Sequence, residues 1–203
     1  MKTNMQAYCE QFIINRDQVK ETLKYGSLYM YPVCANLYLS RQMPVDEGKL
    51  KNCQEWVKEK TGVFSNFRGM IQLPLLCMLS MEENPEEKLD RVLAVYEDLK
   101  TEFYSSTYLP LTAYYLSEQE NILENIARGK AIYQRMKKEH PFLTSSEDSV
   151  FAVLLACSGK DEDVLMHDME ECYRLLKEKF SAGNHIQTVS HILSLADGAA
   201  FEK

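Results

Sequence analysis

The sequence predicts an all-α protein: an array of about four helical hairpins, with an extra helix on the N-terminal side and a closing helix on the C-terminal side. Three observations favour this fold. Phenylalanines recur at a period of 38–39 residues, five apolar segments end in Ser, and the stretches between those segments carry apolar residues at helical spacing. The recurring residues are Phe64, Phe103, Phe142 and Phe180. Because no stretch keeps a convincing period of two, the alternative is an irregular compact helical bundle rather than a sheet.

Each predicted hairpin contains a short apolar helix. The five apolar segments read YPVCANLYLS, LPLLCMLS, LPLTAYYLS, FAVLLACS and TVSHILS, and they close at Ser40, Ser80, Ser117, Ser158 and Ser194. Three prolines, at positions 32, 74 and 110, stand near the starts of such segments. The first helical turn tolerates proline because its N–H groups have no partner within the helix, so these prolines do not argue against helices.

A longer amphipathic helix is predicted between successive apolar segments. In the stretch from Asn84 to Phe103, five apolar residues lie at i, i+3, i+4, i+7 and i+10: Leu89, Val92, Leu93, Tyr96 and Leu99. Asn84 before Pro85 is typical of a helix start. Similar stripes occupy 119–138 and a stretch from about Asp163, and TSSED at 144–148 offers two overlapping capping boxes that predict another helix start.

The recurring phenylalanine is interpreted as the residue that packs each turn between hairpins. We therefore expect Phe103, Phe142 and Phe180 to be buried. Tyr104 and Tyr108 follow the first of these, at places where other copies carry Ser, Arg or His, and at least one of them is expected to be exposed. Exposed Tyr suits an interface because it combines a large apolar area with a polar tip.

Length and composition predict one globular domain spanning 1–203. The chain has 45% apolar and 26% charged residues, with only 8 Gly and 6 Pro, as expected of an ordinary folded protein. The formal net charge of -7 disfavours nucleic acid and anionic membranes as partners. No apolar run approaches the length of a membrane span, and the first residues do not resemble a signal peptide. Six cysteines without a CxxC pair therefore indicate a reduced, cytoplasmic protein.

Three segments resemble a known bacterial family. KEHPFLTSSEDSVFAVLLA, YRLLKEKFSAGNHIQTVSHILSLA and GVFSNFRG are similar to the hallmark segments of the domain-of-unknown-function 4003 family, and the similarity covers residues 25 to 196. The resemblance implies helical character. It implies no activity, cofactor or catalytic residue, so it assigns no role to any position of this chain.

Candidate functional residues are those that break the repeat. We interpret His140 as a histidine at a helix C-terminus, His191 as a satisfied core residue in an apolar column, and His185 as a surface residue. With Arg68, Tyr104 and Tyr108 they form the candidate binding set. Asp163, His167, Glu170 and Glu171 fall on one stretch of helix, and a solvated face explains them better than a metal site. No GxSxG, HExxH or glycine-rich phosphate loop is present, so we expect no cofactor and no metal.

Two functional hypotheses remain from the sequence. The first is a non-catalytic helical-repeat protein that offers a groove between its short helices and its inter-repeat turns to a peptide, a partner protein or its own copy. The alternative is a small-molecule enzyme or ligand sensor with a pocket near His140, Arg68 and His191.

Overall fold

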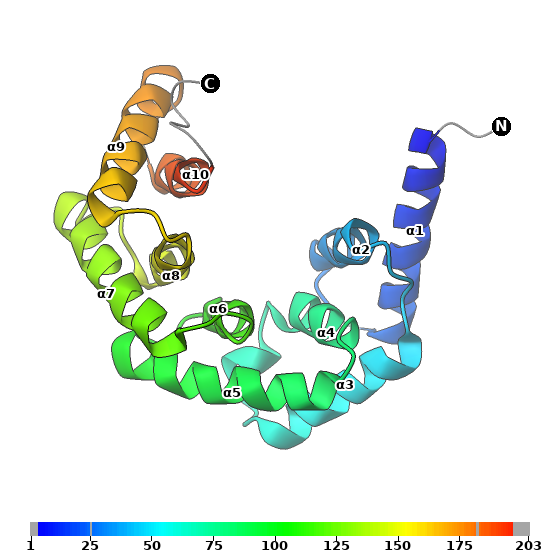
Figure 1. Ribbon diagram of the computed structural model, residues 1–203. Coiled ribbons are helices and arrows are strands. Elements are labelled where there is room, and N and C mark those ends of the chain that lie inside the picture. The colour runs from blue at the N-terminus through cyan, green and yellow to red at the C-terminus, as the bar shows by residue number, and fades with distance from the viewer. Residues whose placement is uncertain (1–3, 25, 182, 197–203) are drawn as a thin grey trace. The chain divides into compact units, whose positions relative to one another are not determined.

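The structure, a computed structural model, describes residues 4–24, 26–181 and 183–196 (Figure 1). Over these ranges the chain forms ten α-helices and two short 3-10 turns, with no strand. The predicted all-α class is therefore confirmed. Apolar residues at a spacing near 3.6 favour helices because they give each helix one face to bury.

The chain divides into two compact units, Met1–Ala94 and Val95–Lys203. The division falls inside one helix, α5 (Pro85–Glu102), rather than in a loop. The interpretation of 1–203 as a single domain stays a prediction.

Five short helices coincide with the five apolar segments: α2 (Met30–Ser40), α4 (Gln72–Ser80), α6 (Leu109–Leu116), α8 (Ser149–Cys157) and α10 (Asn184–Ser194). The shared serine at the end of each segment has a common physical role. Each Ser Oγ donates a hydrogen bond to the carbonyl three residues earlier, at 2.6 to 2.9 Å. The last carbonyls of a helix have no partner within it, so this serine satisfies one of them.

Longer helices separate the short ones: α1 (Asn4–Thr22), α3 (Glu47–Lys60), α5, α7 (Ile122–Glu139) and α9 (Glu162–Lys179). Capping side chains stabilise two of their starts. Asp46 accepts a hydrogen bond from the Lys49 amide at the start of α3, and Asp161 accepts from the amides of Asp163 and Val164 at the start of α9. Acidic side chains in the first turns complement the positive end of the helix dipole.

In the first unit, α1 packs against α2, and both α2 and α3 pack against α4. The core contains a hydrogen-bonded polar group. The hydroxyls of Tyr38 and Ser80 lie 2.5 Å apart, and Tyr31 Oη accepts from the Gly26 amide and donates to the Leu23 carbonyl. Each buried hydroxyl is thereby satisfied.

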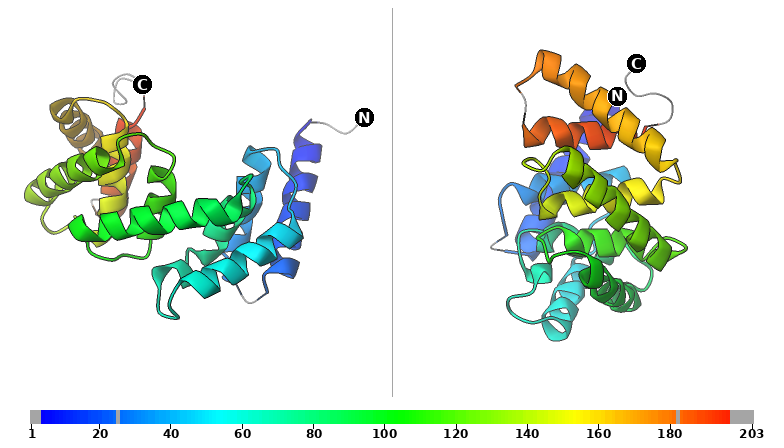
Figure 2. Two further views of the ribbon diagram at one scale, coloured as in Figure 1. Left: turned by 60° about the horizontal axis from the view of Figure 1, so that its bottom comes forward. Right: turned by 90° about the vertical axis from the view of Figure 1, so that its left-hand side faces the viewer.

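In the second unit, α7 packs against α8 and α9 packs against α10, while α8 contacts both α6 and α10 (Figures 1 and 2). Gly129 allows the close approach of α7 and α8, because a Cβ there would lie 2.9 Å from Val153 Cγ2. The 3-10 turn η2 (Ser146–Asp148) leads directly into α8. The core between these helices consists of Ile132, Met136, Ala152, Leu155, Ala156, Leu165, Met166 and Met169.

The expectation of buried phenylalanine anchors is wrong for two of the three residues. Phe103 is 5% exposed and packs edge-on against Tyr133 of α7, but Phe142 is 98% and Phe180 63% exposed. Phe103 directly follows the last residue of α5, whereas Phe142 lies three residues beyond Glu139, the end of α7. Phe180 directly follows α9, but no long helix follows α10 in the described part of the chain to cover it.

Candidate binding site

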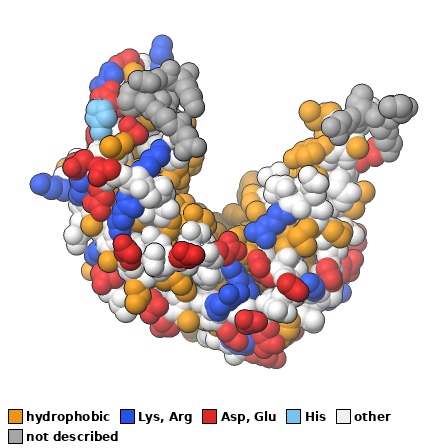
Figure 3. Space-filling model, in the orientation of Figure 1, with side chains coloured by type: hydrophobic (Ala, Val, Ile, Leu, Met, Phe, Trp, Pro, Cys, Tyr) orange, Lys and Arg blue, Asp and Glu red, His pale blue; other side chains and the backbone are white. Residues whose placement is uncertain are grey.

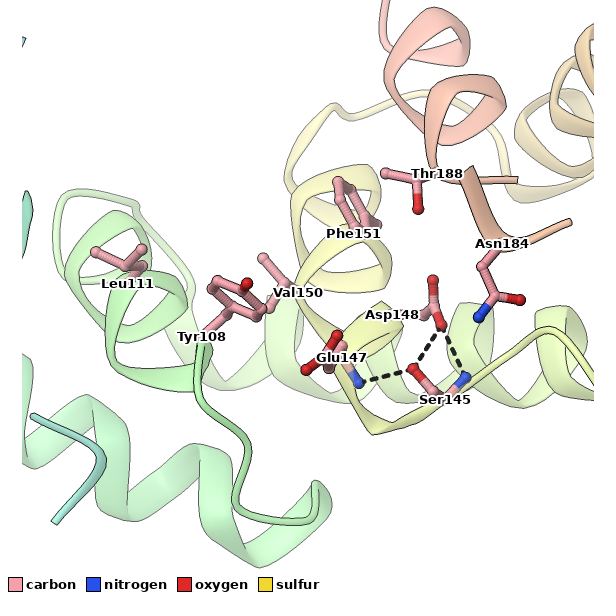
Figure 4. A pocket seen from close by; sticks show the side chains of 9 residues that line it. All are labelled: Tyr108, Leu111, Ser145, Glu147, Asp148, Val150, Phe151, Asn184 and Thr188. Atoms are coloured by element: carbon pink, nitrogen blue, oxygen red, sulfur yellow. Dashed lines mark hydrogen bonds between the residues drawn. The ribbon is translucent and has the colours of Figure 1, made fainter. Parts of the chain in front are cut away.

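The second unit contains a cavity of about 320 Å³ at the N-terminal ends of three helices. Figure 4 shows its side chains projecting from α6, from η2 with the start of α8, and from α10. They are Tyr108, Leu111, Ser145, Glu147, Asp148, Val150, Phe151, Asn184 and Thr188. The cavity therefore combines an apolar, partly aromatic wall with several polar groups, which is the usual composition of a ligand pocket.

Helix starts place the polar groups in the wall. Ser145 and Asp148 form a capping box: Asp148 Oδ2 accepts from the Ser145 amide at 2.7 Å and from Ser145 Oγ at 3.0 Å. Ser145 Oγ accepts in turn from the Glu147 amide (Figure 4). Asn184 is the first residue of α10 and Tyr108 immediately precedes α6. The capping box holds Asp148 in one orientation.

His191 faces Asp148 from α10. Its Nδ1 lies 4.0 Å from Asp148 Oδ1, too far for a hydrogen bond, and its ring lies 5.6 Å from that of Phe151. The side chain is only 2% exposed, and Nδ1 has no hydrogen-bond partner. Burial lowers the pKa of His191 to about 4, although the Asp148 carboxylate opposes the shift. The imidazole is therefore neutral near pH 7. It is buried as predicted, but the expectation of a satisfied histidine is wrong for Nδ1.

Gln187 is a second buried polar group beside this wall. Its Nε2 donates to Thr144 Oγ1 at 3.1 Å, and Thr144 Oγ1 donates to the Met136 carbonyl at 3.2 Å. Gln187 Oε1 has no partner. Since most buried polar groups are hydrogen-bonded, this unpaired acceptor is an exception within the second unit.

A smaller hollow of about 190 Å³ lies at the other side of η2. Ser146 and Ser149 belong to its wall, whereas Ser145 and Asp148 belong to the larger pocket. The remaining lining residues are Glu102, Phe103, Tyr104, Lys130, Tyr133, Gln134 and Lys137. Lys130 lies over the Phe103 ring, with its nitrogen 5.4 Å from the ring centroid. Turn η2 therefore contributes to two neighbouring hollows of different charge.

The structure brings only some predicted site residues to these hollows. Tyr108 lines the larger pocket, and Tyr104, 84% exposed, lines the smaller one. His185 is exposed, near the start of α10. His140, the residue after α7, pairs with Glu170 at 2.6 Å and lines neither hollow.

Arg68 lies in the first unit, in the 3-10 turn η1 (Asn66–Arg68). The three residues of the alternative pocket are thus divided between the units, with His140 and His191 in the second. The capping box was visible in the sequence, but it indicated only a helix start. Phe151 and Thr188 carried no sequence signal, because their role depends on the packing of α8 beside α10.

The acidic stretch of α9 forms ion pairs instead of a ligand set. Asp163 pairs with Arg135 at 2.8 Å, and Glu171 with Arg174 at 2.9 Å. Over the described residues, no group of three or more His, Cys, Asp or Glu side chains could hold a metal ion. Figure 3 shows Lys and Arg side chains interspersed with Asp and Glu side chains on the face that it draws. No described helix has both the length and the apolar character needed to cross a bilayer.

Comparison with known proteins identifies one family. The family described as "Protein of unknown function (DUF4003)" matches residues 15–203. A curated relative, the uncharacterized protein YeaA of Bacillus subtilis (strain 168), is 30% identical over 169 residues, which cover 79% of this chain and 51% of YeaA. The chain thus spans about half the length of that relative. No solved structure matches it.

Proposed function

This chain belongs to the DUF4003 family, and we propose that it is a non-catalytic binding protein for an extended peptide segment of a partner. The observation that carries the proposal is the pair of hollows on either side of η2, one containing Tyr108 and the other Tyr104. A peptide that crosses η2 would place one side chain in each hollow.

The size and chemistry of the hollows support a peptide. Volumes of about 320 and 190 Å³ suit individual side chains rather than a folded surface. Aromatic residues stand in both walls, and Tyr is enriched among residues that dominate binding energy. The exposed polar groups at the rim, Ser145 and Asn184, can hydrogen-bond the main chain of an extended segment.

The arrangement of titratable groups favours binding over chemistry. His191 is neutral near pH 7 and does not reach the cavity wall, so it is not placed to exchange a proton with a bound molecule. His140 is engaged by Glu170. These features support a pocket that holds a side chain rather than one that transforms it.

The proposal also includes a repeat architecture and a cellular location. The stacked hairpins would form a regular repeat array that displays the short helices to a partner. A reducing, cytoplasmic location is proposed because all six cysteines are thiols and burial raises the pKa of Cys53 to about 12 and of Cys157 to about 11, which suits stable, unreactive thiols. The net charge of -7 argues for partners other than nucleic acid.

The test is selection of peptides from a random decapeptide library displayed on phage, followed by affinity measurement on synthetic peptides. Tyr108→Ala is expected to weaken binding by about tenfold, and Tyr104→Ala by less, because truncating an aromatic residue in a pocket removes contact area. Tyr29→Ala is the matched control, since Tyr29 is an exposed tyrosine of the first unit.

Two results would contradict the proposal: selection that yields no saturable binder, or binders unaffected by both tyrosine variants. In either case a metabolite screen by thermal shift, with His140→Ala and His191→Leu as variants, would test the enzyme or sensor alternative.

A further inference from the structure

Two carboxylates stand in the wall of the larger pocket. Among the described residues that line it, Glu147 and Asp148 are the charged ones, and the others are neutral. A low-dielectric cavity strengthens the interaction of such charges with a ligand, so the wall attracts a cation. The net charge of -7 on the whole chain acts in the same direction.

Helix N-termini at the pocket would ordinarily favour an anion, because their free amides carry partial positive charge. At the start of η2, the protein itself already occupies this anion-binding position. Asp148 Oδ2 accepts the Ser145 amide hydrogen, so the anion at this helix start is the protein's own carboxylate. A second anion in the cavity would face both Asp148 and Glu147.

The pocket wall itself offers one carboxylate oxygen that accepts no hydrogen bond. Asp148 Oδ2 takes both hydrogen bonds from Ser145, while Oδ1 lies 4.0 Å from His191 Nδ1, too far for a hydrogen bond. Gln187 Oε1 and His191 Nδ1 are also buried without partners, but neither residue lines the pocket. A ligand that binds Asp148 Oδ1 must therefore bring an N–H or O–H donor.

The geometry of Asp148 selects among cations. A guanidinium binds best when both oxygens of a carboxylate accept its parallel N–H groups. Because Oδ2 is engaged by Ser145, only Oδ1 of Asp148 is left to accept, and bidentate pairing of a guanidinium with Asp148 is blocked. An ammonium has three donors around a compact charge, so it can bind Oδ1 and reach Asn184 or Thr188 at the same time.

The apolar part of the wall suits the stem that carries the ammonium. Val150, Phe151 and Leu111 line the cavity together with the Tyr108 ring. Lysine packs its four methylenes on apolar surface while its head remains polar, and an aromatic ring attracts a cation placed over its face. We propose that the pocket formed by α6, η2–α8 and α10 is a recognition pocket for a lysine side chain of the bound peptide.

This inference rests on the proposed function and names the side chain that the peptide supplies. The test uses five pools of fluorescein-labelled heptapeptides, randomised except for a central Lys, acetyl-lysine, Arg, Leu or Glu, titrated with the full chain in a polarisation assay. The Lys pool is expected to bind about tenfold more tightly than the acetyl-lysine pool, since acetylation removes the charge and two donors. It is also expected to bind more tightly than the Arg pool.

Variants assign the effect to the pocket. Glu147→Gln should weaken Lys-pool binding several-fold and leave acetyl-lysine binding unchanged, and Asp148→Asn should weaken it further. Glu120→Gln is the matched control, because Glu120 is an exposed glutamate of the same unit outside the pocket wall. Asp148 also caps η2, so its variant counts only if its helical circular dichroism matches wild type; Glu147→Gln carries the test otherwise.

Failures of the two proposals are distinguishable. Equal binding of the Lys, acetyl-lysine and Leu pools would overturn the lysine pocket and leave peptide binding intact, and so would preference for the Glu pool. No binding by any pool would overturn both. Free n-pentylamine is the final competitor: if it binds as tightly as the Lys pool, the pocket recognises a free amine and the peptide assignment is overturned.

Discussion

The two units bury different polar clusters between their short helices. In the first unit, Tyr38 of α2 and Ser80 at the end of α4 share a hydrogen bond, and Ser80 also donates to the Cys77 carbonyl. In the second, His191 and Gln187 of α10 each keep a buried atom without a partner. Both clusters lie where neighbouring short helices meet. They differ in whether their buried polar atoms have hydrogen-bond partners.

The difference lies in how much each cluster contributes to stability. A satisfied network in a low-dielectric core adds stability and fixes side-chain positions, whereas an unpaired polar group costs free energy. The hydroxyls of the first unit's cluster are hydrogen-bonded, although Tyr38 also lines a hollow of about 570 Å³. In the second unit, Asp148 lies 4.0 Å from His191 Nδ1 and also lines the cavity of about 320 Å³, whereas His191 and Gln187 do not line it.

The largest expected effect is a pH-dependent loss of stability that comes from His191. The pKa of His191 is about 4 in the folded chain and near 6.5 in the unfolded one. Above pH 6.5 the imidazole is therefore neutral in both states, and it does not change the free energy of unfolding with pH. As the pH falls from 6.5 to 4, only the unfolded state takes up the proton. Unfolding therefore becomes easier by about 3 kcal/mol. Urea denaturation of wild type and His191→Leu at pH 7 and pH 4 measures the difference between them.

His191→Leu is a suitable replacement because α2 carries Leu37 and α8 carries Leu155 at the corresponding place. Acid also protonates carboxylates in both proteins. The effect of His191 is therefore the difference between wild type and His191→Leu in how steeply the unfolding free energy changes with pH. The exposed His185 on the same helix provides the control, and His185→Leu should keep the full pH-dependent loss. A His191→Leu profile parallel to wild type would remove the contrast with the first unit.

The predictability of the fold from sequence is also uneven, and local chemistry explains where it succeeded. Asn84 and Pro85 marked the start of α5 because capping and a fixed proline φ act within one turn. The five closing serines marked helix ends for the same reason. The prediction that Phe142 is buried was wrong because its burial depends on the path of the chain after α7. His140 and the proline after it follow the end of α7, and Phe142 is exposed.

The site was predictable only in fragments. Tyr108 was predicted as a candidate because it follows Phe103 in a turn where other copies carry Arg or His, and it lines the pocket. Asp148 was read only as a cap, since the sequence does not show that α10 brings His191 to within 4.0 Å of it. Contacts between residues more than 40 positions apart depend on packing, and no periodicity encodes them.

A medium effect is expected from Ser80→Ala in the first unit. The variant leaves the hydroxyl of Tyr38 buried without this partner, and a cost of about 2 kcal/mol in unfolding free energy follows. Tyr38→Phe should cost about 1 kcal/mol, because Ser80 keeps its bond to the Cys77 carbonyl. The double variant should resemble Tyr38→Phe alone, since no hydroxyl is then left unpaired.

Ser158→Ala is the control for that series. Ser158 occupies the corresponding helix end and donates to the Leu155 carbonyl, but it is exposed to water. Its loss should change the unfolding free energy by less than about 0.5 kcal/mol. Equal effects of Ser80→Ala and Ser158→Ala would mean that the Tyr38–Ser80 bond contributes nothing, and the first unit's cluster would no longer differ from the second's.

The smallest expected effect, Gln187→Met, tests the second cluster most directly. Methionine keeps the length of the side chain, removes the unpaired Oε1 and gives up only the bond from Nε2 to Thr144, whose hydroxyl still donates to the Met136 carbonyl. A lost bond of about 1 kcal/mol is offset by the removal of an unsatisfied acceptor of similar cost, so urea denaturation should give a change within about 1 kcal/mol of zero. A loss above about 2 kcal/mol would show that Gln187 belongs to a satisfied structural network like that of Tyr38. If the variant instead leaves the unfolding free energy almost unchanged but weakens binding of the Lys pool, Gln187 contributes to ligand binding and not to stability.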